Sequence, residues 1–216
     1  MKLYFVRHGQ TDWNAQGRFQ GSQGDSPLTE QGVEDAKSLG QALSSLTFDR
    51  SFTSPLHRAQ ETLSLLLAEN NHFTHPEVVS DLREWNLGRL EGQSIATLKS
   101  IYPKEIDAFY HNLAQFHTAI FSADSVPQTL KRFSDFIYSL EGQGLERVLI
   151  VSHGAILTAS IRHLLGYETA QLRQAGGLLN TSLTVLETQD FQSFNLIDWN
   201  DTNYEAIANK VAKGLL

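Results

Sequence analysis

Short apolar runs alternate with longer amphipathic segments along the chain, and this alternation predicts the fold class. Runs of strand-forming residues cover 2–6, 48–53, 78–79, 148–151, 181–188 and 192–199. The last two form a predicted hairpin, with Asp190 near its turn. Because helical segments separate the other runs, we expect an α/β three-layer sandwich with a mostly parallel central sheet and helices on both faces.

The segments between these runs carry apolar residues at helical spacing. They predict helices over 29–43, 55–69, 126–141, 154–165 and 203–213, and two aromatic-rich helices within 94–121. Residues 10–28 are rich in Gly, Gln, Asp and Asn without a clear period, so we expect a loop there. No repeat or linker divides the chain, which favours one domain over residues 1–216.

The composition permits a substantial core and excludes several classes of function. Hydrophobic residues make up 41% and charged residues 19% of the chain. The formal net charge of −7 argues against a general nucleic-acid binder, because such proteins present basic patches to phosphates. The absence of cysteine excludes disulfides, thiolate metal sites and cysteine nucleophiles. With no signal peptide and no apolar stretch of about 20 residues, we expect a cytoplasmic protein with no membrane partner.

Two predicted strands each run directly into a histidine followed by a glycine. His8 and Gly9 follow the first strand, with Arg7 before them, and His153 and Gly154 follow the aliphatic strand. Ligands of open α/β sheets bind outside the carboxyl ends of the strands, so we expect both histidines in one site. A single histidine is more often structural, but two such junctions favour a functional site.

Two further segments carry charged side chains that suit phosphate chemistry. Arg58 lies in the first turn of the helix that Ser54 and Pro55 introduce, near the end of the helix dipole that favours anions. Glu84 lies in the acidic segment 81–85, and Glu91 follows shortly after. Taken alone, such an arginine is usually a surface residue and such a glutamate a solvated carboxylate.

Together these segments resemble the histidine phosphatase superfamily, also called the phosphoglycerate mutase-like family. The matching segments, in the family's order, are 7–14, 17–21, 27–32, 54–62, Leu82-Arg83-Glu84 with Glu91-Gly92, Asp124-Ser125 with Arg132, and Ser152-His153-Gly154. The resemblance covers nearly the whole chain and implies a phosphoglycerate mutase-like fold.

The resemblance also implies a role for each candidate residue. His8 would be the nucleophile that forms a phosphohistidine, while Arg7, Arg58 and His153 would hold the phosphoryl oxygens. Cations around His8 favour its neutral imidazole, and guanidinium groups suit phosphoryl oxygens. Glu84 would be the proton donor, because an alcohol leaves poorly as alkoxide. Residues expected along the phosphate or substrate are Arg7, Asn14, Gln20, Gly21, Arg58, His153 and Gly154. The mechanism requires no cofactor and no metal.

Three features depart from the family pattern. The loop 21–27 is one residue longer than the usual spacing, and Asp124-Ser125 stands where a Glu-Ser pair is common. Ala155 stands where the family often has a second glycine. These departures bear on the substrate rather than on the core chemistry.

Three functions compete on this evidence. The first is a phosphatase acting on a small phosphorylated metabolite, and the second is a phosphoglycerate mutase. Cofactor-dependent mutases carry a longer proline-rich insertion after the acidic motif, whereas residues 93–123 here contain only Pro103, which favours the phosphatase. The third is a non-catalytic module that binds phosphorylated ligands, against which the intact set of candidate catalytic residues argues.

The helical insertion at about 93–123 has two interpretations. Its aromatic residues suit a lid over the substrate, and they suit an ordinary core equally well. A homodimer through an exposed sheet edge is compatible with such a fold, and the resemblance leaves several phosphorylated metabolites as candidate substrates.

Overall fold

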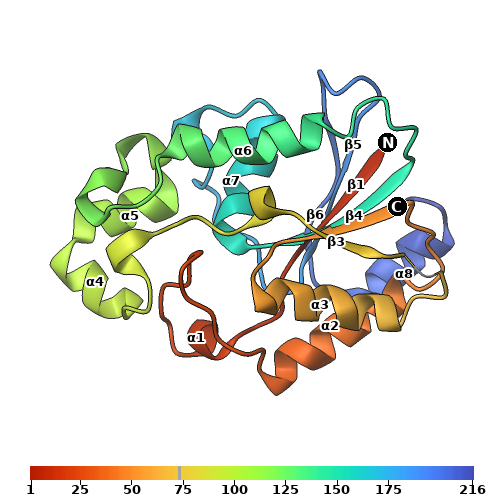
Figure 1. Cartoon of the computed structure of the whole chain (residues 1–216), viewed down its shortest axis with the longest axis horizontal. Coiled ribbons are helices and arrows are strands. Elements are labelled where there is room, and N and C mark those ends of the chain that lie inside the picture. The colour runs from red at the N-terminus through yellow and green to blue at the C-terminus, as the bar shows by residue number, and fades with distance from the viewer. Residues whose placement is uncertain (73) are drawn as a thin grey trace.

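Six strands form the central sheet of the computed structural model, which describes residues 1–72 and 74–216 (Figure 1). They are β1 (Lys2–Arg7), β2 (Arg50–Thr53), β3 (Pro76–Val78), β4 (Arg147–Ser152), β5 (Leu183–Glu187) and β6 (Asn195–Asp201). Their order is β3-β2-β4-β1-β5-β6, in which the first four are parallel and β5 runs antiparallel to β1 and β6. The predicted α/β fold with a mostly parallel sheet and a terminal hairpin is confirmed.

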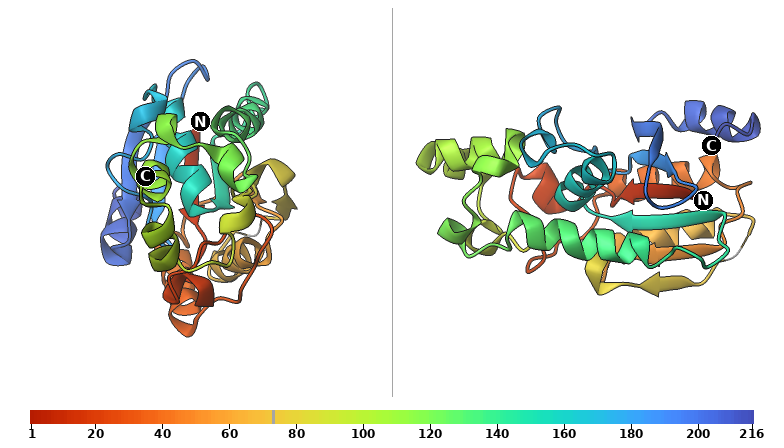
Figure 2. Two further views of the ribbon diagram at one scale, coloured as in Figure 1. Left: turned by 90° about the vertical axis from the view of Figure 1, so that its left-hand side faces the viewer. Right: turned by 90° about the horizontal axis from the view of Figure 1, so that it is seen from above.

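Helices cover both faces of this sheet (Figures 1 and 2). They are α1 (Asp12–Ala15), α2 (Glu30–Ala42), α3 (His57–Ala68), α4 (Ile95–Ile101), α5 (Pro103–His111), α6 (Val126–Tyr138), α7 (Gly154–Leu164) and α8 (Tyr204–Ala212). Helices α2, α3 and α8 pack on one face, and α6 and α7 pack on the other. None of the helices in the described part of the chain is long and apolar enough to span a bilayer.

Strand β1 shows why the sheet needs helices on both sides. Leu3 and Phe5 face the α6–α7 layer, while Tyr4 and Val6 face the α2–α3–α8 layer, and all four side chains are fully buried. A strand buried on both faces has a continuous apolar sequence, which is the pattern that the sequence shows here and in β4.

The segment 10–28 differs from the predicted loop, because it contains the four-residue helix α1. Thr11 and Asn14 form a reciprocal capping box that satisfies backbone N–H groups at both positions. The missing apolar period conceals this helix, since α1 has no buried residue and is held by its cap instead.

A third cluster of buried apolar residues lies beyond the end of the sheet, where α4 and α5 stand apart from the main layers (Figure 1). Phe109 and Phe116 pack there against Trp85, and Phe121 stacks on Phe116. Helices α4 and α5 are followed by two short 3-10 turns, Leu113–Gln115 and Thr118–Phe121. The insertion is therefore joined to the acidic segment through a shared core.

Gly88, three residues after the acidic segment, contacts the insertion. Its φ of +53° is left-handed, and an added Cβ would overlap the carbonyl oxygen of Phe121. Gly142 has a similar φ of +74° but open space around its Cα.

We expect Gly142→Ala to lower the free energy of unfolding by about 1–2 kcal/mol through backbone strain. The overlap of the new Cβ with Phe121 should make Gly88→Ala lower the free energy of unfolding by about 1–3 kcal/mol more than Gly142→Ala does. Urea denaturation of both variants measures the difference, and equal losses would contradict this contact.

Candidate active site

The two His-Gly junctions meet because β1 and β4 are neighbours in the sheet. Arg7 pairs with Ser152 at their carboxyl ends, so His8 and His153 leave the sheet side by side. The backbone N–H of His8 donates to the carbonyl of Ser152 at 2.9 Å, and the two imidazole centroids lie 5.1 Å apart. The structure thus brings together the histidines that lie 145 positions apart in sequence (153 − 8).

A cavity of about 200 Å³ opens beside these strand ends. Of the candidate residues, it is lined by Arg7, His8, Asn14, Gln20, Glu84 and Gly154. Arg58 and His153 are fully buried next to His8 and do not line the cavity. Gly21 does not line the cavity either. Further wall residues are Arg18, Phe19, Leu87, Ile95, Phe109, Tyr110, Ala155, Arg173, Gly177 and Leu178. The wall of the cavity therefore carries both cationic side chains and aromatic side chains.

Hydrogen bonds fix the tautomer of His8. Its Nδ1 lies 2.7 Å from the carbonyl oxygen of Gly9. Since a carbonyl only accepts, Nδ1 carries the proton and Nε2 keeps a lone pair. Burial, followed by the charges of Arg58 and Arg7, lowers the pKa of His8 well below 6.5. The imidazole is therefore neutral at physiological pH, with an available lone pair on Nε2.

Arg58 is held against that atom by loop 21–27, to which it donates three hydrogen bonds. Its Nε donates to His8 Nε2 at 3.3 Å, its Nη2 to the carbonyl of Gly21 at 2.9 Å, and its Nη1 to the carbonyl of Gly24 at 3.1 Å. Its Nη1 also donates to Asp25 Oδ1 at 2.8 Å. Gly21 thus contributes its backbone to Arg58 rather than a direct wall to the cavity.

Asp25 is a site residue that sequence reasoning missed. Besides Arg58, it accepts a hydrogen bond at 2.8 Å from the backbone N–H of His57, the first residue of α3. A carboxylate at this end of a helix is favourably placed. The only signal in the sequence was the unusual length of loop 21–27, in which Asp25 lies.

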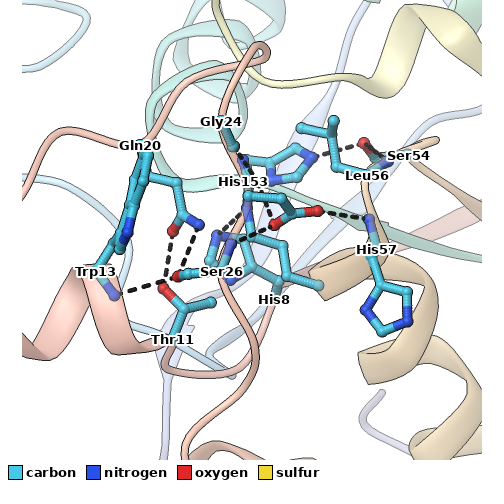
Figure 3. A network of polar contacts seen from close by, with 12 residues as sticks. His8, Thr11, Trp13, Gln20, Gly24, Ser26, Ser54, Leu56, His57 and His153 are labelled. Carbon is cyan, nitrogen blue, oxygen red and sulfur yellow. Dashed lines mark hydrogen bonds and ion pairs between the residues drawn. The ribbon is translucent and has the colours of Figure 1, made fainter. Parts of the chain in front are cut away.

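The remainder of this loop is tied to α1 through side chains (Figure 3). Gln20 accepts from the Thr11 hydroxyl at 2.8 Å and donates to Ser26 at 3.1 Å, and Ser26 accepts from the Trp13 N–H at 3.2 Å. Gln20 therefore stabilises the loop as well as lining the cavity.

Asn14 connects α1 to the backbone of His8 through Asn180. Its side-chain oxygen accepts from the Thr11 N–H at 3.2 Å and from Asn180 Nδ2 at 3.1 Å. Asn180 Nδ2 also donates to the carbonyl of His8 at 3.0 Å. Asn180 was absent from the candidate residues, because nothing in its neighbourhood follows a recognisable pattern.

His153 is oriented by Ser54 (Figure 3). Its Nε2 lies 2.6 Å from Ser54 Oγ, which already accepts a hydrogen bond from the Leu56 N–H. Within the described residues the Ser54 hydroxyl has no other acceptor, so we assign its proton to the contact with His153 Nε2 and the ring proton to Nδ1. His153 Nδ1 is buried without a hydrogen-bond partner, so its N–H is an unused donor next to His8. Burial, followed by Arg58, His8 and Arg7, lowers the pKa of His153 well below 6.5.

Glu84 is held at the beginning of α7. Its Oε1 accepts from the backbone N–H groups of Trp85 and Ile156 at 2.8 and 2.9 Å, and its Oε2 accepts from Ala155 at 2.9 Å. The segment that carries it is clamped by Arg132, whose Nη2 donates to the Glu84 carbonyl at 3.0 Å. Oε2 is the less engaged oxygen, because it accepts one of these three hydrogen bonds and Oε1 accepts two.

Arg7 reaches the cavity across the backbone of Gly154. Its Nη1 donates to the carbonyl of Leu178 at 2.6 Å, while its Nε is buried without a partner. A Cβ on Gly154 would come within 2.9 Å of that Nε, so the glycine is needed for close approach. Burial lowers the pKa of Arg7 to about 10, with the charge of Glu84 opposing this shift and Arg173 and Arg58 adding to it.

Within the described residues, no three His, Asp or Glu side chains cluster as metal ligands would.

The family comparison decides the identity of this site. The model of the histidine phosphatase superfamily (branch 1) matches residues 3–202. The chain belongs to the histidine phosphatase superfamily.

Its relatives within the superfamily include mutases and phosphatases. The chain is 33% identical over 201 residues to the 2,3-bisphosphoglycerate-dependent phosphoglycerate mutase of Actinobacillus pleuropneumoniae, covering 80% of this chain and 88% of that one. The structure of Bacillus stearothermophilus YhfR has a TM-score of 0.83 and 27% identity, covering 94% of this chain and 98% of that chain. Mycobacterial glucosyl-3-phosphoglycerate phosphatase has a TM-score of 0.81 and 26% identity, covering 92% and 98%.

The pairing of Asp25 with Arg58 predicts that Asp25 positions this arginine in the site. We expect Asp25→Asn to lower kcat for 4-nitrophenyl phosphate by about 3- to 30-fold, because Arg58 loses a charged partner that is partly exposed. Asp25→Glu should recover part of the loss. Asp135→Asn on the exposed side of α6 makes the same change in net charge and serves as the control. Full activity in Asp25→Asn would contradict the positioning role.

The two buried histidines also predict how stability depends on pH. Unfolded histidine gains a proton below about pH 6.5, whereas folded His8 and His153 stay neutral because their pKa values are lowered. Their contribution is thus complete above pH 6.5 and is lost as the pH falls toward the folded pKa values. Each histidine contributes a slope of up to about 1.4 kcal/mol per pH unit.

Urea denaturation between pH 5 and 7 measures this slope. We expect a shallower pH dependence when His8→Asn and His153→Asn are combined. The pair His111→Asn and His117→Asn, at exposed positions, removes the same number of histidines and serves as the comparison. Equal slopes in the wild type and the buried double variant would show that these histidines are protonated in the folded protein.

Proposed function

We propose that the protein is a phosphatase that hydrolyses a phosphate monoester of a small metabolite through a phosphohistidine on His8, with Glu84 as proton donor. The observation that carries this proposal is the tautomer of His8. Its Nδ1 is engaged by Gly9, and it lines the cavity with Nε2 unprotonated beside Arg58. A neutral imidazole with this lone pair is a nucleophile for phosphorus.

In the first step, His8 Nε2 forms a bond to phosphorus as the ester P–O bond breaks. The proton on Glu84 Oε2 passes to the leaving oxygen, so the alcohol departs neutral. Arg7, Arg58 and the Nδ1–H of His153 donate to the phosphoryl oxygens. These donors are fixed by the fold, which is the condition for stabilising charge in the transition state.

In the second step, the Glu84 carboxylate accepts a proton from water. The water oxygen bonds to phosphorus as the bond to His8 Nε2 breaks, which releases inorganic phosphate. Glu84 is then protonated and His8 neutral, as both were at the start. One carboxyl group therefore serves as acid and then as base.

The size and walls of the cavity support a small substrate. A cavity of about 200 Å³ accommodates a compact metabolite, and Ile95, Phe109 and Tyr110 of the insertion cover one side of it. The insertion at about 93–123 would thus cover the bound substrate.

A phosphoglycerate mutase is the second candidate, supported by 33% identity to the mutase of A. pleuropneumoniae. The phosphoglycerate mutase of Bacillus anthracis has a TM-score of 0.74, against 0.81 for the mycobacterial phosphatase. This comparison favours the phosphatase. Supplying 3-phosphoglycerate with and without 2,3-bisphosphoglycerate separates the two: free phosphate supports the phosphatase, and 2-phosphoglycerate without phosphate supports the mutase.

The central test uses 4-nitrophenyl phosphate, without added metal, on the wild type, two site variants and one control variant. His8→Ala should release no phosphate, whereas exposed His111→Ala should match the wild type. Nitrophenolate leaves without an acid, so Glu84→Gln should still form the phosphoenzyme but hydrolyse it about 100-fold more slowly or worse. A burst of nitrophenolate and a phosphoryl adduct on the intact protein are then expected in Glu84→Gln.

Two outcomes would count against the proposal. Turnover that survives His8→Ala would exclude His8 as the nucleophile. A wild-type protein that binds phosphate but neither turns over esters nor forms an adduct would instead support a non-catalytic module that binds phosphorylated ligands.

A further inference from the structure

Arg173 is a buried cation on the cavity wall that the reaction at His8 does not use. It follows the 3-10 turn Thr169–Gln171 and is only 6% exposed. It lines the same cavity as His8. Within the described residues, no carboxylate lies within 4.0 Å of its guanidinium, and its Nε is buried without a hydrogen-bond partner.

The insertion holds this guanidinium in place. Its Nη1 donates to the carbonyl of Phe109 at 3.0 Å. Its Cζ lies 4.3 Å from the centroid of the Phe109 ring and 5.2 Å from that of Tyr110. Aromatic faces attract a cation without neutralising it. Arg173 is thus fixed in position while its charge stays available to a ligand.

Among the described residues, Arg173 has no carboxylate in contact, and the charge of Glu84 acts on it only from beyond 4.0 Å. Asp25 pairs with Arg58, and Glu84 is the carboxylate on the wall, where backbone N–H groups of α7 engage both of its oxygens. Burial lowers the pKa of the Arg173 guanidinium, because water solvates its charge poorly. An uncompensated buried charge is destabilising, so a ligand anion that meets it binds favourably.

We propose that Arg173 binds a second anionic group of the substrate, a carboxylate or a second phosphate on the alcohol portion, while the transferring phosphoryl group lies at His8. The substrate class is then a phosphate monoester with two anionic ends, and Phe109 and Tyr110 contact its carbon chain. This inference rests on the proposed function for which end reacts.

Three probes of similar size test the second anion. They are 3-phosphoglycerate, which carries a carboxylate, 1,3-propanediol bisphosphate, which carries a second phosphate, and glycerol 3-phosphate, which carries neither. We expect the wild type to have a higher kcat/KM for one or both of the probes with two anionic ends than for glycerol 3-phosphate. Arg173→Met should reduce this preference tenfold or more, the scale of a lost hydrogen bond between charged groups. Arg173→Lys should keep part of it.

Arg162→Met is a matched control for damage to the loop. Arg162 is also buried, stacks on Trp199 at 4.7 Å, and donates to the carbonyls of Leu172 and Gly176 on either side of Arg173. It does not line the cavity that contains His8. If Arg173 acts on the substrate, Arg162→Met keeps the wild-type preference among the probes.

Binding to His8→Ala separates this inference from the proposed function. Calorimetric titration of His8→Ala with the three probes, with and without Arg173→Met, needs no turnover. Discrimination that depends on Arg173 supports the inference even if the wild type hydrolyses nothing. Turnover with an equal preference in the wild type and Arg173→Met, or the same loss in Arg162→Met, overturns it while leaving the phosphatase intact. If Arg173→Met does not fold by circular dichroism, Arg173→Gln replaces it in both measurements.

Discussion

The hydrogen bond between His8 Nδ1 and the carbonyl of Gly9 determines what the rest of the site can do. It places the ring proton on Nδ1 and leaves a lone pair on Nε2, at a 2.7 Å contact within a buried junction. The carbonyl is available because the chain turns at Gly9 directly after β1. Burial and two neighbouring arginines then keep the imidazole neutral. Without this contact, nothing in the structure would fix which nitrogen of His8 faces Arg58 with a lone pair.

The cations divide into those that the protein compensates and those that it leaves for a ligand. Asp25 compensates Arg58, which is consequently held against His8. Arg7 and Arg173 have a buried Nε without a partner and no carboxylate partner among the described residues. Under the proposed function, both guanidinium groups meet the anionic substrate, and the cost of burying their charge then contributes to binding.

Much of this arrangement could be predicted from the sequence, because it depends on local patterns. The apolar runs identify the strands, and the two His-Gly junctions require only that β1 and β4 be neighbours. Ser54, Asp25 and Arg173 could not be assigned in this way. Their roles depend on where loops far apart in the sequence meet: Ser54 lies 99 positions from His153, and Arg173 contacts the backbone of Phe109, 64 positions away. Helix α1 was missed for a different reason, since a capping box rather than apolar spacing stabilises it.

The protonation of His8 in the folded protein tests the central claim most directly. Long-range ¹H–¹⁵N correlation spectra of imidazole-labelled protein, with His8→Asn used for assignment, distinguish the three forms of the ring. We predict a neutral His8 with the proton on Nδ1 at pH 6.5 and below, because its pKa is lowered. A proton on Nε2, or an imidazolium at pH 6.5, would contradict the account, since neither form can attack phosphorus through Nε2.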